Sequence, residues 1–88
     1  LEFAGKTYVF TGRFYHGTLT ACQKEVEERG GCCAKGVTKA TNVLVIGDLG
    51  SRDWAHTSFG RKIQKAVSYR DGGVALAIVG EEHWVAHL

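Results

Sequence analysis

The sequence has no proline, only three cysteines and no long apolar run. Its longest apolar stretches reach about six residues, too short for a membrane-spanning helix or the core of a signal peptide. Adjacent Cys32 and Cys33 cannot easily bridge each other, and the odd cysteine count argues against a disulfide framework and for a reducing, cytosolic setting. A net charge of +2 and a pI near 8.5 are too weakly basic for nonspecific coating of nucleic acid, so any nucleic-acid contact should be local.

The 88 residues, 44% apolar and 23% charged, predict one compact domain spanning residues 1–88, too small for a cleft between domains. The chain begins at Leu1 instead of methionine. We therefore expect it to be either a processed chain or, as we favour, a domain excised from a larger protein.

Two short apolar runs, 7–12 and 41–47, each end in glycine. Blocks of this kind are typical of strands buried on both faces of a parallel sheet. A capping box at 20–23 and charged residues at helical spacing predict a helix over 18–29, ended by Gly30 and Gly31. The other predicted elements are a short extended segment at 32–35, a helix from Ser58 closed by 71–73, a strand at 74–79 and a closing helix from Gly80.

This βαββαβα order favours an α/β fold with a four-stranded parallel sheet of order 2-1-3-4 and helices on both faces. Thr11 and Gly12 then lie at the carboxyl end of the first strand, beside the start of the second helix. That position binds anions in open α/β sheets, because backbone N–H groups and a helix N-terminus converge there. In the alternative interpretation Thr11 only ends a strand and Gly12 only turns the chain.

Basic residues of the second predicted helix, Arg61, Lys62 and Lys65, could supply the charge that strengthens a phosphate contact, or could form a solvated helix face. No glycine-rich nucleotide loop is present, so no cofactor is implied. No spacing suggests a catalytic acid, base or nucleophile, and the cysteines are interpreted as core residues. His83 and His87 are four apart on the closing helix, but a solvated helix end explains them better than a metal site.

The two tryptophans have different expected roles. Trp84 should anchor the closing helix, on one stripe with Val85 and Leu88. Trp54 lies in a polar segment without periodicity, where an exposed indole could contact a partner protein. The hydrophobic patch of a protein-interaction module could lie around Trp54 or around Phe14 and Tyr15.

The chain resembles a BRCT domain over about residues 3–88. The residues that carry the resemblance are Phe3 to Lys6, Val9 to Gly12, Gly30-Gly31, Val37 to Val45, Gly60 to Ala66 and Trp84. They are most similar to the bacterial branch found in NAD-dependent DNA ligases and in some exonucleases of DNA-polymerase type. The family fold, a parallel sheet of order 2-1-3-4 with three helices, agrees with the order argued above.

The resemblance implies a noncatalytic binding module of a DNA replication or repair enzyme, in the bacterial cytoplasm at the nucleoid. In phosphate-binding members, the Ser or Thr and the Gly after the first strand, with a lysine of the second helix, hold a phosphopeptide or a DNA 5′ phosphate. Thr11 and Gly12 match the first two, Lys65 is the expected third with Lys62 as alternate, and Arg13 and Arg61 are expected nearby.

Two departures from the family pattern affect what the chain should bind. The segment 47–58 is longer than usual for ligase-type members, and the chain has one repeat where phosphopeptide readers usually have two. DNA near a 5′ phosphate is therefore the expected partner. A protein-interaction module, acting on a phosphopeptide, on a second copy or within the parent protein, is the alternative.

Overall fold

The computed structural model describes residues 2–47 and 58–88. The elements, in chain order, are β1 (Thr7–Thr11), α1 (Leu19–Glu28), β2 (Cys32–Ala34), β3 (Val43–Ile46), α2 (Ser58–Asp71), β4 (Ala77–Gly80) and α3 (Glu81–Val85). All paired strands are parallel, in the order β2-β1-β3-β4. This arrangement confirms the α/β class, the strand order and the three helices. No helix in the described part of the chain is long and apolar enough to cross a membrane.

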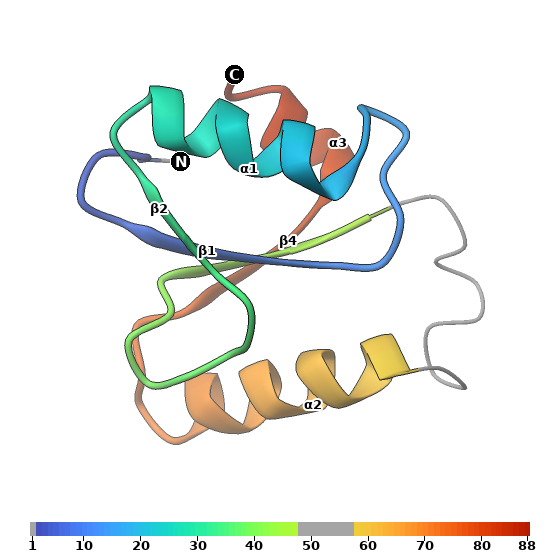
Figure 1. Cartoon of the computed structure of the whole chain (residues 1–88). Helices are drawn as coiled ribbons and strands as arrows, with labels where there is room; N and C mark the ends of the chain where they lie inside the picture. Colours follow the sequence, from blue (N-terminus) through green and yellow to red (C-terminus); the bar gives the residue numbers. More distant parts are fainter. Residues whose placement is uncertain (1, 48–57) are drawn as a thin grey trace.

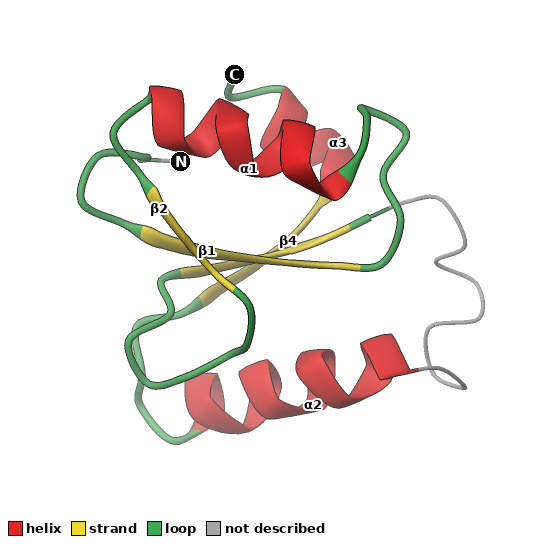
Figure 2. Ribbon diagram, in the orientation of Figure 1, coloured by secondary structure: helices red, strands yellow, loops and turns green. Residues whose placement is uncertain are grey.

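Helices cover both faces of the sheet, with α1 and α3 on one side and α2 on the other (Figure 1; Figure 2 separates the helices from the strands by colour). Each side has its own core. The buried residues on the α1/α3 side are Tyr8, Phe10, Phe14, Cys22, Val26, Val43, Val45 and Trp84. Those on the α2 side are Val9, Val37, Leu44, Ile63, Ala66 and Leu76.

Strand β1 is central and contributes to both cores. Tyr8 and Phe10 belong to the α1/α3 core and Val9 belongs to the α2 core. Because successive side chains of a strand point to opposite faces, Thr11 shares the α2 face with Val9. Burial on both faces explains why this strand is a continuous apolar run instead of an alternating one.

The N-cap of α1 is Thr18, two residues before the expected capping box. The hydroxyl of Thr18, in extended backbone, accepts a hydrogen bond from the N–H of Ala21 at 3.2 Å. The capping box at 20–23 is therefore wrong, because Thr20 already lies within the first turn and its place is taken by Thr18. The predicted end is correct: the N–H of Gly30, at φ +86°, bonds to Glu27, and that of Gly31 bonds to Val26.

Strand β4 is shorter than the predicted strand at 74–79. The N–H of Val74 bonds to the carbonyl of Tyr69, so this residue still belongs to the turn that leaves α2. The ladder starts at Ala77, whose N–H bonds to Asn42 at 2.9 Å. Leu76 is nevertheless buried, which is why the sequence pattern extends further than the strand.

Two expected core assignments are wrong. Trp84 is fully buried and meets Phe10 edge to face, but Val85 remains 37% exposed. Consecutive residues on a helix are separated by about 100°, so Val85 cannot share the inward direction of Trp84. Among the cysteines, Cys22 is buried and Cys33 is half-buried, whereas Cys32 is exposed, since neighbouring residues of a strand face opposite sides.

Candidate functional site

The hydroxyl of Thr11 is buried without a partner at the carboxyl end of β1. Thr11 is only 3% exposed, and its Oγ1 has no hydrogen-bond partner among the described residues. Its main chain is paired, because the Thr11 carbonyl accepts the N–H of Gly47 at 2.8 Å. A buried hydroxyl without a partner is costly, so this oxygen is the clearest candidate for a ligand contact. The contact requires rotation about χ1 or a small opening of the edge, since Oγ1 is inaccessible to solvent.

Two glycines bring the exits of β1 and β3 close together beside Thr11. Gly12 has φ +86°, a conformation that side chains rarely adopt. Gly47 is buried, and a Cβ placed on it would overlap the carbonyl group of Arg13. Neither position could carry a side chain without strain or overlap, so the two strand exits pack directly against each other through their main chains.

The loop after Gly12 is held by the side chain of Glu81, on the α1/α3 side of the sheet. This carboxylate is 3% exposed and begins α3. Its Oε1 accepts the N–H of Tyr15 at 3.0 Å and its Oε2 accepts the N–H of His16 at 2.6 Å. Tyr15 and His16 precede Glu81 by 66 and 65 positions in the chain, so this contact leaves no local signal in the sequence.

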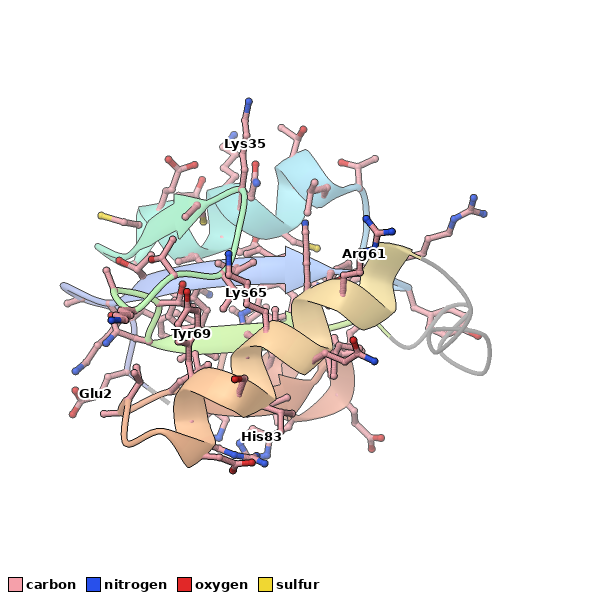
Figure 3. The ribbon with its side chains drawn as sticks, turned by 90° about the horizontal axis from the view of Figure 1, so that it is seen from below. Glu2, Lys35, Arg61, Lys65, Tyr69 and His83 are labelled. Atoms are coloured by element: carbon pink, nitrogen blue, oxygen red, sulfur yellow. The ribbon has the colours of Figure 1, made fainter. Side chains whose placement is uncertain are left out.

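Helix α2 brings basic side chains toward the same edge of the sheet. Its first turns lie below the carboxyl end of β1 in Figure 1, and Figure 3 shows Arg61 nearer to that end than Lys65. Arg61 is exposed, whereas Lys62 is half-buried, one turn before the buried Ala66. Lys62 is thus the basic residue at the margin between the packed face of α2 and solvent.

Lys65, expected to be the third phosphate-binding residue, has a different neighbour in the structure. Its ammonium lies 5.9 Å from the centroid of the Tyr69 ring, one turn further along α2. A cation over an aromatic ring is weakly stabilised there. This contact directs Lys65 toward the carboxyl end of the helix, and Thr11 lies at the other end.

The other residues expected to make contacts have different positions in the structure. Arg13 is exposed and follows Gly12 directly. Trp54 lies outside the described residues. In the expected patch at 14–15, Tyr15 is 71% exposed, but Phe14 is buried in the α1/α3 core, edge to face with Phe10 and Trp84. The prediction that Phe14 belongs to an exposed patch is therefore wrong, because the loop directs its ring into the core.

Among the described residues, neither the thiols nor the histidines form a reactive cluster. Burial raises the pKa of Cys22 and that of Cys33 to about 11, which keeps both thiols protonated and poorly nucleophilic. The His83 and His87 rings are 5.0 Å apart. Within residues 2–47 and 58–88, no group of three or more His, Cys, Asp or Glu side chains could hold a metal ion.

The chain is similar to a short part of bacterial DNA ligases. It is 45% identical over 47 residues, 53% of the chain, to a protein named DNA ligase from Geobacter metallireducens. It is 39% identical over 62 residues, 69% of the chain, to a DNA ligase from Shouchella clausii. These matches span only 7% and 9% of the two ligases. No protein-family model matches the chain.

Proposed function

We propose that this chain is a BRCT-type domain, a noncatalytic module of a DNA ligase or related DNA repair enzyme, that binds DNA beside a 5′ phosphate. The parallel sheet of order β2-β1-β3-β4 with three helices and the similarity to part of two DNA ligases support this proposal. A separate cofactor is not required, because the chemistry is recognition of an anion. The expected setting is the bacterial cytoplasm.

The proposed phosphate position is the carboxyl edge of β1. There the Thr11 hydroxyl and the Gly12 N–H donate to phosphate oxygens, and Lys62 supplies a charge-assisted hydrogen bond. The N-terminus of α2 adds a favourable partial positive charge. Arg13 and Arg61, both exposed, flank the position, and Lys65 can join it only by leaving the Tyr69 ring.

The observation that carries the proposal is the unpartnered Thr11 hydroxyl. If Thr11 only ended a strand, valine would fill the same space without burying a polar group that costs about 1–3 kcal/mol. A phosphate oxygen would give this hydroxyl the acceptor that it lacks. The two glycines let the exits of β1 and β3 come close together beside this hydroxyl.

The test is a titration of nicked duplex DNA carrying either a 5′ phosphate or a 5′ hydroxyl at the nick, followed by fluorescence anisotropy. Wild-type protein should bind the phosphorylated nick more tightly. Thr11→Val should remove the preference while preserving the fold. Thr7→Val is the matched control, because Thr7 lies on the same face at the opposite end of β1. A preference that survives Thr11→Val would refute the assigned site.

The same titration distinguishes the two lysines. Lys62→Gln should reduce the preference for the phosphorylated nick by about tenfold, the size expected for one charged hydrogen bond. Lys65→Gln should have a smaller effect, because its ammonium rests over Tyr69. A larger effect of Lys65→Gln than of Lys62→Gln would instead assign Lys65 to the phosphate site.

A protein-interaction module is the second candidate, and one surface favours it. Tyr15, Leu19 and Val85 are the exposed large hydrophobic residues in the described part of the chain. Tyr15 and Val85 line a shallow pocket of about 320 Å³, together with His16, Glu81 and Glu82. Exposed apolar groups of this kind suit a partner protein. Weak binding to both nicks, with a nearly flat salt dependence, would favour this function over DNA binding.

A further inference from the structure

Charge is unevenly divided between the two sides of the sheet. On the α2 side, the segments 35–47 and 58–73 carry six basic residues, Lys35, Lys39, Arg61, Lys62, Lys65 and Arg70, and one acid, Asp71. On the opposite side, α1, its C-cap and α3 carry five acids, Glu25, Glu27, Glu28, Glu81 and Glu82, and two basic residues, Lys24 and Arg29. In these described segments, basic side chains therefore predominate on the α2 side and acidic ones on the α1/α3 side, although Glu81 is buried.

Four of the basic residues on the α2 side are exposed and have no carboxylate partner within the described residues: Lys35, Lys39, Arg61 and Lys65. Arg70 differs, because it lies 3.7 Å from Asp71. In Figure 3, Arg61 and Lys65 leave α2 on the side of the helix that faces β2, and Lys35 projects beyond β2 in the same direction. We call these four residues the basic face.

Apolar groups are distributed in the opposite way. The exposed large hydrophobic residues, Tyr15, Leu19 and Val85, all belong to α1, to α3 or to the loop that Glu81 ties to α3. A protein partner usually needs an apolar centre in its contact surface, which the basic face lacks among the described residues. A polyanion needs only repeated positive charge, so the basic face fits a phosphate backbone better than a protein.

We propose that the basic face binds the phosphate backbone of duplex DNA, in a contact that continues from the 5′ phosphate position, which Arg61 flanks, along α2 to Lys35 and Lys39. This inference rests on the proposed function for the identity of the ligand. The duplex lies along α2 and the loop between β2 and β3, with its 5′ end at Thr11. The acidic α1/α3 side repels the duplex, so the polarised charge orients the domain before the end is bound.

Backbone contacts and recognition of the end phosphate have different signatures. Each phosphate contact releases counterions and adds about 0.9 to the slope of log K against log salt, whatever the sequence or end chemistry. Losing such a contact therefore weakens phosphorylated and hydroxyl-ended DNA equally. Losing the 5′ phosphate site weakens only the binding of phosphorylated DNA, so the ratio of the two affinities changes.

The experiment measures salt dependence for Lys35→Glu, Lys39→Glu and Lys24→Glu on nicked duplexes with either end. All three variants change the charge equally at an exposed lysine, but Lys24 lies on α1, on the acidic side. The first two variants should weaken both DNAs by the same factor and reduce the slope by about one. Lys24→Glu should leave the slope unchanged, and thermal melts should show that all three remain folded.

The outcomes separate the two proposals. A preserved phosphate preference with identical slopes for wild type, Lys35→Glu and Lys39→Glu would overturn the basic face and leave the end site intact. Reduced slopes without any phosphate preference in the wild type would support the basic face and refute the end site. An equal loss of slope in Lys24→Glu would also overturn the basic face, because net charge alone would then explain the binding.

Discussion

The Oε2 atom of Glu81 accepts the backbone N–H of His16 at 2.6 Å, which joins the start of α3 to the loop that follows the candidate phosphate site. The same carboxylate accepts the N–H of Tyr15 at 3.0 Å. Hydrogen bonds to a charged acceptor are stronger than neutral ones. The position of Gly12, only three residues before Tyr15, is therefore coupled to a side chain from the far end of the chain.

Glu81→Gln should loosen this loop. The amide retains one acceptor oxygen but presents an NH₂ group to the second backbone donor, so one N–H loses its partner. We expect a loss of about 1.5–3 kcal/mol in the free energy of unfolding, measured with urea, and faster amide exchange at Tyr15 and His16. Glu82→Gln is the control, because Glu82 is an exposed neighbour. Unchanged exchange at both amides would show that the loop does not depend on Glu81.

Gly47→Ala should disrupt the carboxyl edge of the sheet. The added Cβ would overlap the carbonyl group of Arg13, so one of the two strand exits must move. We expect a loss of stability of about 1–3 kcal/mol and a weaker preference for the 5′ phosphate. Gly36→Ala is the matched control, since nothing lies within 4 Å of its Cβ position. Equal melting temperatures for the two variants would contradict the close approach at Gly47.

Trp84 should tolerate phenylalanine much better than alanine. Its ring is fully buried against Phe10 and Phe14, so Trp84→Ala should cost about 3–5 kcal/mol, much of the stability of a small domain. Its Nε1 is buried and has no partner among the described residues, so Trp84→Phe removes an unsatisfied donor as well as volume. Urea unfolding should place Trp84→Phe closer to wild type; equal losses in the two variants would contradict the packing of this ring against Phe10 and Phe14.

The thiols should react in the order of their exposure. Cys32 is exposed, whereas burial raises the pKa of Cys22 to about 11 from its usual 9.0. Iodoacetamide at neutral pH should therefore modify Cys32 first and Cys22 only after unfolding, as read by mass spectrometry of peptides. Rapid alkylation of Cys22 in the folded protein would contradict its burial.

The same pKa shift predicts a pH dependence of stability. Because the folded protein holds the Cys22 proton more tightly than the unfolded chain, this contribution is complete below pH 9.0 and is lost as the pH rises through about 11. Cys22→Ala should reduce the loss of stability across this range. A loss of the same size in the variant would assign it to other groups, including Cys33.

The alternation of strands and helices and most element positions could be predicted from the sequence, because they depend on local patterns. The strand order then followed from the rules for crossover connections. The apolar runs ending at Gly12 and Gly47 mark buried strands wherever they pair. The predictions failed where local patterns are ambiguous. Val74 is apolar like a strand residue but bonds to Tyr69 in the turn after α2, and Thr20 resembles a cap although Thr18 performs that role.

The candidate site also has features that could be predicted from the sequence and features that could not. The sequence by itself determined the types of group at the sheet edge, the hydroxyl of Thr11 and the flexible backbone of Gly12, because both follow directly from a strand that ends there. Only the tertiary structure decided that Thr11 Oγ1 lacks a partner, that Lys65 rests over Tyr69 and that Glu81 anchors the loop. These relationships depend on how elements pack across the sheet, and packing between residues far apart in the chain leaves no periodic signal in the sequence.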